Sequence, residues 1–151
     1  MHILMCNDDG ILADGLRQLA TYLSQYYRVT VVAPATEQSA KSHALTTEIP
    51  LKLDAYNGED ENPRLYALTG TPSDCMKFGL SYLLADDMPD LVISGINHGF
   101  NLGSDVLYSG TVSAAMESAF YGIPGLALSV ERYSIRSEEH TSELQSPAMI
   151  S

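Results

Sequence analysis

Two consecutive carboxylates, Asp8 and Asp9, are the residues that most directly suggest chemistry in this sequence. They follow an apolar run, His2–Cys6, and precede Gly10, so we expect them on a turn at the end of a buried strand. On a turn both side chains can aim at one point, where they repel each other unless a cation lies between them. The pair indicates a site for a hard divalent cation, Mg²⁺, Mn²⁺ or Ca²⁺, although an exposed β-turn is the simpler alternative.

A glycine-rich loop from Gly95 to Gly110 is the second candidate. Its glycines would let backbone N–H groups approach a ligand closely. The loop ends in Ser109-Gly110-Thr111, which leads into a predicted helix. The N-terminus of a helix offers free N–H groups and the positive end of the helix dipole, which together bind anions. The loop therefore predicts a phosphate site, and a flexible loop with an ordinary threonine cap is the alternative.

Alternating strand and helix patterns would position these residues. Buried strands are predicted at His2–Cys6, Val29–Ala33, Leu65–Leu68, Asp90–Ser94 and Gly125–Val130, with a shorter strand at Leu51–Leu53. Three helices are predicted. The first follows a cap at Asp14 and has Leu16, Leu19, Ala20 and Leu23 on one apolar face. The second runs from a cap at Thr71 to about Leu84, and the third from Thr111 or its neighbour through Tyr121.

This alternation predicts an α/β fold with a doubly wound, mostly parallel sheet and helices on both faces, a Rossmann-like core. In such sheets ligands bind outside the carboxyl ends of the strands. If the strands are neighbours, the acid pair, the segment after Pro34 and Asn97 would converge on one crevice.

Composition narrows the class of protein. A chain of 151 residues favours one domain, and its net charge of −11 disfavours binding to nucleic-acid duplexes or anionic membranes. Cys6 and Cys75 form neither a zinc pattern nor a disulfide framework, and Cys6 is predicted to be a buried core thiol. We see no secretory signal and no run of about 20 apolar residues, so a cytoplasmic location is expected.

Four segments together resemble proteins of the SurE family. They read ILMCNDDGILADG, VVAPATEQSAKSHALT, GTPSDC and DLVISGINHGFNLGSDVLYSGTVSAAMESAFYGIPGLALS, in family order across residues 1–134. The resemblance implies a metal-dependent phosphatase, a 5′-nucleotidase that hydrolyses nucleoside 5′-monophosphates. It also implies a homodimer or tetramer assembled partly through a C-terminal extension.

The resemblance also implies site residues. One divalent ion, Mg²⁺ or Mn²⁺ with Ca²⁺ as a further candidate, would be held by Asp8, Asp9, Ser39 and Asn97. Substrate and phosphate would be bound by Asn7, Gly95, Asn101, Ser109, Gly110 and Thr111, with Asn7 either approaching substrate or orienting the acid turn. Asp8 or Asp9 would accept the proton of the attacking water, and the sequence does not choose between them. His98 is a candidate acid for the leaving oxygen, although a solvated histidine is the preferred interpretation.

The last residues have a different character. Residues 136–146 read RSEEHTSELQS, which looks like the translation of a widely used sequencing adapter, with one apolar residue and no amphipathic period. We therefore expect 136–151 to be a non-native, disordered tail, and 1–135 to be a phosphatase domain that is incomplete at its C-terminus. Such a fragment should be less stable than the intact protein, and an inactive fragment is one alternative.

Two other classes of protein share parts of this pattern. Signalling domains that accept phosphate on aspartate need an aspartate after the third strand and a lysine near the last, whereas here Ser94-Gly95 ends the third strand and Gly125–Val130 has no lysine. A non-catalytic nucleotide-binding module would use the glycine loop without the acid pair. Against it, Gly95 to Gly103 does not match the dinucleotide-binding fingerprint.

Overall fold

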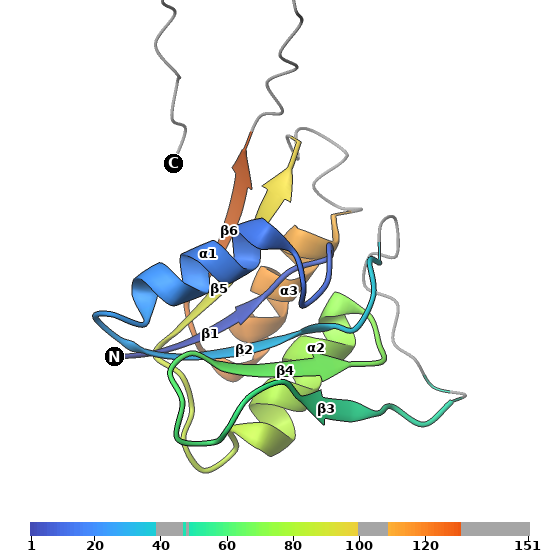
Figure 1. Ribbon diagram of the computed structural model, residues 1–151. Coiled ribbons are helices and arrows are strands. Elements are labelled where there is room, and N and C mark those ends of the chain that lie inside the picture. The colour runs from blue at the N-terminus through green and yellow to red at the C-terminus, as the bar shows by residue number, and fades with distance from the viewer. Residues whose placement is uncertain (39–46, 48, 100–108, 131–151) are drawn as a thin grey trace, which may run out of the picture.

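The computed structural model describes residues 1–38, 47, 49–99 and 109–130 of the chain. Its strands form one sheet in the order β3-β4-β2-β1-β5-β6 (Figure 1). The strands are β1 (His2–Cys6), β2 (Arg28–Pro34), β3 (Leu53–Ala55), β4 (Arg64–Leu68), β5 (Leu91–His98) and β6 (Gly125–Val130). All pairings are parallel except that of β3 with β4, which is antiparallel. The predicted doubly wound, mostly parallel α/β fold is confirmed.

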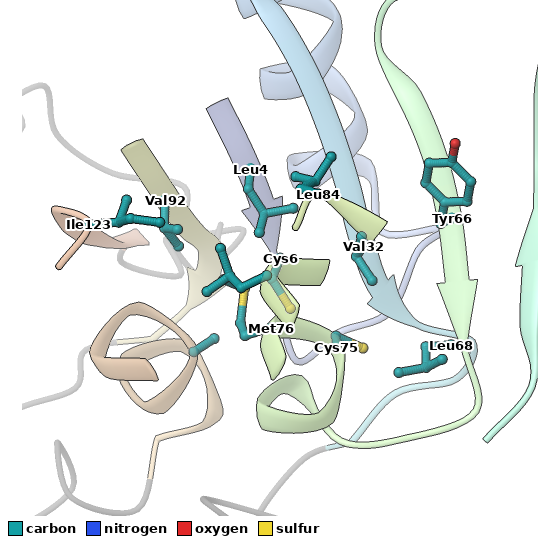
Figure 2. Packing of buried hydrophobic residues seen from close by; sticks show 12 residues of the cluster. Leu4, Cys6, Val32, Tyr66, Leu68, Cys75, Met76, Leu84, Val92 and Ile123 are labelled. Carbon is teal, nitrogen blue, oxygen red and sulfur yellow. The ribbon is translucent and has the colours of Figure 1, made fainter. Parts of the chain in front are cut away.

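The sheet has two buried faces, because side chains of successive strand residues alternate. On β1, Ile3 and Met5 pack with α1 (Asp14–Leu23), whereas Leu4 and Cys6 face the opposite side. That second face is covered by α2 (Pro72–Phe78) and α3 (Gly110–Glu117). Figure 1 shows α1 on one side of the sheet with α2 and α3 on the other, and Figure 2 shows the apolar layer beneath α2 and α3.

Helix α1 begins one residue away from the expected cap. Ala13 is the N-cap residue and makes no side-chain capping bond, so the prediction that Asp14 caps the helix is wrong. Asp14 instead occupies the first turn, where the positive end of the helix dipole stabilises its negative charge. The predicted apolar face is confirmed: Leu16 and Ala20 are buried, and Leu19 and Leu23 pack against the core.

Helix α2 begins as its sequence predicts. The Thr71 hydroxyl accepts a hydrogen bond from Asp74 N at 3.1 Å, and the Asp74 carboxylate accepts one from Thr71 N at 2.9 Å. This reciprocal pair is a capping box, and Pro72 occupies the first helical position. After Phe78 the helix continues as a π-helical turn, Gly79–Leu83, so the predicted end near Leu84 is also confirmed.

Helix α3 is capped by Ser109 and continues as a 3₁₀ turn, Ser118–Tyr121. Gly122 then adopts a left-handed conformation with φ of 70°, which ends the helix as predicted. The chain next enters β6, which forms one edge of the sheet and is largely exposed along its length.

Two strands differ from the sequence prediction. The short strand predicted at Leu51–Leu53 lies at Leu53–Ala55, where Leu53 pairs with Leu68 and Ala55 with Tyr66. β5 does not end at Ser94 but continues to His98, so the expectation that a loop begins at Gly95 is wrong. Pairing with β6 explains the extension, because Asn97 and His98 resume the ladder opposite Ser129 and Val130 after an irregularity. None of the helices within the described ranges combines the length and apolar composition needed to cross a membrane.

Candidate metal and phosphate site

The acid turn lies where the winding of the sheet reverses. From β1 the chain moves outward to β2 and β4, and then returns to the other side of β1 as β5. Cys6 at the end of β1 pairs with Ser94 on β5, so Asp8 and Asp9 leave the sheet beside the extended end of β5. Crevices at such reversal points are the usual ligand sites of open parallel sheets.

Asn7 holds the acid turn in shape. Its amide donates a hydrogen bond to the Gly10 carbonyl oxygen at 3.0 Å and accepts one from Gly10 N at 3.0 Å. The side chain is buried, and Gly10 has a φ of 101°, a conformation that favours glycine. This geometry supports the orienting role predicted for Asn7, and an approach to substrate stays a prediction.

The segment after β2 packs onto the acid turn. Gln38 N donates to the Asp8 carbonyl oxygen at 2.8 Å, and Ile11 N donates to the Pro34 carbonyl oxygen at 2.8 Å. These two backbone bonds join the ends of β1 and β2, so the expected convergence of their loops is confirmed. Ser39, the predicted ligand on this segment, lies just outside the described residues.

The side chain of Asp8 approaches the N-terminus of α3. Its Oδ1 accepts a hydrogen bond from the Thr111 hydroxyl at 3.0 Å, and Thr111 is fully buried. A Cβ on Gly110 would lie 2.9 Å from the Cβ of Asp8 and 3.3 Å from the Cγ of Pro72. Gly110 therefore leaves the space that the carboxylate needs. Three chain segments, the acid turn and the starts of α2 and α3, meet at this point.

The first turn of α3 has backbone N–H groups that are available to a ligand. Ser109 caps the helix by accepting a hydrogen bond from Val112 N at 3.3 Å. Within the part of the chain that the structure describes, the N–H groups of Gly110 and Thr111 have no acceptor. With the helix dipole, these groups are suited to bind a phosphate oxygen. The structure thus brings Gly110 and Thr111 next to Asp8, and phosphate binding by Ser109, Gly110 and Thr111 stays a prediction.

Asn97 supplies a further oxygen at the same end of the sheet. It is half-buried near the end of β5, and its Nδ2 donates to the Gly99 carbonyl oxygen at 3.2 Å. This bond leaves Oδ1 as the free ligating atom of the amide. Two adjacent carboxylates and an amide oxygen form a set that fits a hard divalent cation. Across residues 1–38, 47, 49–99 and 109–130, no group of three or more His, Cys, Asp or Glu side chains is placed to hold a metal ion.

Other predicted residues are placed differently or fall outside the described ranges. Gly95 is buried within β5 with a φ of 127°, and a Cβ there would collide with the Leu128 carbonyl oxygen. The close contact between β5 and β6 therefore explains why position 95 is a glycine. A role of Gly95 in phosphate binding stays a prediction. His98 is exposed at the end of β5, and no described contact tests it as an acid. Asn101 lies outside the described residues.

Both thiols lie beneath the acid turn. Cys6 and Cys75 are fully buried, as predicted for Cys6, and the Cys6 thiol contacts the Pro72 carbonyl oxygen at 3.8 Å. Burial raises the pKa of the Cys75 thiol well above its ordinary value, and the neighbouring Cys6 raises that pKa further.

Known proteins share this arrangement of sequence and fold. Residues 3–150 match the family model described as survival protein SurE. The chain belongs to the SurE family. The SurE crystal structure from Aquifex aeolicus aligns with a TM-score of 0.78 and 42% sequence identity, covering 89% of this chain and 53% of that one.

Curated SurE relatives are also similar in sequence. The protein named 5′-nucleotidase SurE from Thermoanaerobacter sp. (strain X514) is 56% identical over 129 residues, covering 85% of this chain and 50% of the relative. A protein of the same name from Clostridium botulinum (strain Alaska E43 / Type E3) is 47% identical over 143 residues, covering 95% of this chain and 56% of the relative. The chain thus spans about half the length of the curated SurE relatives it matches.

The SurE family match reaches into the tail whose sequence indicates a non-native origin. That interpretation, and the proposed domain boundary at residue 135, stay predictions because 131–151 lie outside the described residues.

Three features of this SurE site were missed from the sequence. They are the bond from Thr111 to Asp8, the close approach of Gly110 to both Asp8 and Pro72, and the backbone bond from Gln38 to Asp8. None has a local signal, because each joins residues distant in sequence. The bonding of Asn7 to Gly10 did have one, since asparagine commonly bonds to nearby backbone in turns.

Proposed function

We propose that this chain carries the catalytic site of a divalent-metal-dependent phosphatase that hydrolyses nucleoside 5′-monophosphates. The observation that carries the proposal is the meeting of the Asp8 carboxylate with the N-terminus of α3 at the reversal point of the sheet. This proximity supports a cation site beside an anion site, which is the pairing that a phosphate ester requires. The names of the SurE relatives support the activity and the substrate class.

The cation would be held by Asp8, Asp9 and Asn97, with Ser39 as the fourth predicted ligand. When bound, Mg²⁺ or Mn²⁺ would polarise a phosphate oxygen and lower the pKa of a bound water. A chain with a net charge of −11 gains a local positive charge in this way.

The chain's own groups would bind the phosphate and move the proton. The N–H groups of Gly110 and Thr111 donate to phosphate oxygens, where charge increases as the ester bond breaks. A carboxylate oxygen of Asp8 or Asp9 accepts a proton from the attacking water. Water oxygen bonds to phosphorus, the bond from phosphorus to the ribose oxygen breaks, and that oxygen takes up a proton. A solvent water is the preferred donor of that proton, and His98, which is exposed at the end of β5, is a further candidate.

The test is phosphate release from nucleoside 5′-monophosphates with Mn²⁺, with Mg²⁺ and with excess chelator. A curated SurE relative serves as the positive control in the same assay. Asp8→Asn and Asp9→Asn should each lower kcat/KM by at least about 100-fold, because each removes a charge from the site and a candidate base. Asp54→Asn, a change at a half-buried carboxylate on the edge strand β3 that pairs with Lys52, is the matched control and should leave the rate unchanged.

Two results would argue against the proposal. Release that is insensitive to chelator would contradict metal dependence. A folded chain that binds nucleotide but releases no phosphate, while the positive control is active, would favour a non-catalytic nucleotide-binding module. Assembly into a homodimer or tetramer stays a prediction, which sedimentation of the purified chain would test.

A further inference from the structure

Thr111 has a different environment from the other residues predicted to hold phosphate. Its side chain is fully buried, and its hydroxyl donates to Oδ1 of Asp8 at 3.0 Å. A hydroxyl has one proton to donate, so this proton is not available to a phosphate oxygen. Only the backbone N–H of Thr111 remains for that purpose.

The bond reaches across 103 positions of sequence and joins two parts of the site. Asp8 lies on the turn after β1, whereas Thr111 lies in the first turn of α3. The two segments approach closely at this point, since a Cβ added to Gly110 would lie 3.4 Å from Asp8 Oδ2 and 3.3 Å from the Cγ of Pro72. The hydrogen bond from the buried Thr111 hydroxyl therefore favours one orientation of the Asp8 carboxylate, in which Oδ1 faces Thr111.

We propose that Thr111 is a positioning residue, whose hydroxyl holds the Asp8 carboxylate in the orientation that binds the divalent cation. The inference rests on the proposed cation site. Oδ1 is held by Thr111, while Oδ2 has no donor within the described part of the chain and is free to ligate. Partners that orient a ligating carboxylate in this way contribute strongly to metal affinity.

The inference is tested by Mn²⁺ binding to the 151-residue chain, measured by titration calorimetry without nucleotide. Thr111→Val keeps the shape of the side chain but removes the hydroxyl, and the Mn²⁺ dissociation constant should rise roughly 10- to 100-fold. Thr111→Ser restores the hydroxyl and should return the constant to within about threefold of the wild-type value, since the hydrogen bond to Asp8 is regained.

Ser113→Ala is the matched control. Ser113 is also buried in the first half of α3, but its hydroxyl donates to the Gly110 carbonyl oxygen at 2.9 Å and not to a carboxylate. Its loss should lower stability without changing Mn²⁺ affinity, and circular dichroism would confirm that all variants are folded. A folded Thr111→Val that binds Mn²⁺ as tightly as wild type would overturn the inference, as would a wild-type chain that binds no Mn²⁺.

The binding measurement separates this inference from the proposed activity. Mn²⁺ binding that weakens in Thr111→Val, in a chain that releases no phosphate, would support the positioning role and refute the phosphatase. Release of phosphate by the wild-type chain, with unchanged Mn²⁺ affinity in Thr111→Val, would support the phosphatase and refute the positioning role.

Discussion

At the scale of single residues, Asn7 is the side chain on which the shape of the acid turn depends. It is 1% exposed and makes two hydrogen bonds, both to the backbone of Gly10. A buried amide with both groups satisfied stabilises one turn conformation, because any other arrangement would leave a buried polar group without a partner. The direction in which Asp8 and Asp9 leave β1 follows from that conformation.

Asn7→Ala should therefore weaken both folding and cation binding. Losing two neutral hydrogen bonds should lower the free energy of unfolding by about 1–3 kcal/mol, measured by urea denaturation. Mn²⁺ affinity should fall as well, because the carboxylates lose their common orientation.

Asn57→Ala is a matched control for Asn7. Asn57 also bonds to backbone across a turn, donating to the Pro63 carbonyl oxygen at 2.7 Å and accepting from Leu65 N at 2.8 Å, and it donates to the Glu61 carboxylate at 3.3 Å. Asn57→Ala should lower the free energy of unfolding by a similar amount, without changing the Mn²⁺ affinity. Equal Mn²⁺ affinities in the two alanine variants would contradict the orienting role of Asn7.

At the scale of elements, the start of α3 is constrained by its neighbours more than by helix propensity. Glycine is a poor helix former, and alanine in its place usually stabilises a helix. At Gly110, however, the added Cβ would meet Asp8 and Pro72, which belong to backbone-anchored positions and cannot easily move away.

Gly110→Ala should lower the free energy of unfolding by about 1–3 kcal/mol, because the added methyl group overpacks the start of α3. Gly15→Ala in α1 is the comparison, since its Cβ would lie 3.6 Å from the Ile96 Cβ, an ordinary contact. That variant should gain about 0.5–1 kcal/mol. Paired urea denaturation curves would measure both, and a stabilised Gly110→Ala would show that the contact with Asp8 is not tight.

At the scale of the whole molecule, the end of the sheet opposite the site carries a buried histidine. His2 is 3% exposed, and its Nε2 lies 3.0 Å from the Thr30 hydroxyl, which also accepts from Arg64 at 3.2 Å. Burial lowers the pKa of His2 below its ordinary value, and the charge of Arg28 lowers that pKa further, whereas Asp87 opposes the shift. This shift favours the neutral form of His2 in the folded protein.

Stability should depend on pH through this residue. In the unfolded chain His2 takes up a proton near the ordinary histidine pKa of about 6.5, whereas the folded state does so only at lower pH. The unfolded state then binds more protons, so the free energy of unfolding should fall as the pH decreases below about 6.5. His2→Gln should lessen this slope between about pH 7.5 and 5.5 in urea denaturation. Identical slopes for the two proteins would contradict a buried neutral His2.

Much of the fold follows from local sequence patterns. The apolar run His2–Cys6 becomes β1, the Thr71 capping box begins α2, and Gly122 ends the helical segment after α3. Each depends on residues within a few positions, so periodicity and capping chemistry are sufficient to predict it. The adjacent pair Asp8-Asp9 and the helix start at Ser109-Gly110-Thr111 were recognisable for the same reason.

Other features were decided only by tertiary structure. The strand order places β1 between β2 and β5, β6 extends β5 through Asn97, and Thr111 reaches Asp8. Each results from pairing or packing between segments far apart in sequence, which no local pattern specifies. The sequence by itself determined which residues are candidates to bind a cation and a phosphate. The folded sheet decided that they meet, because parallel strands bring their carboxyl ends to one edge and α3 begins there.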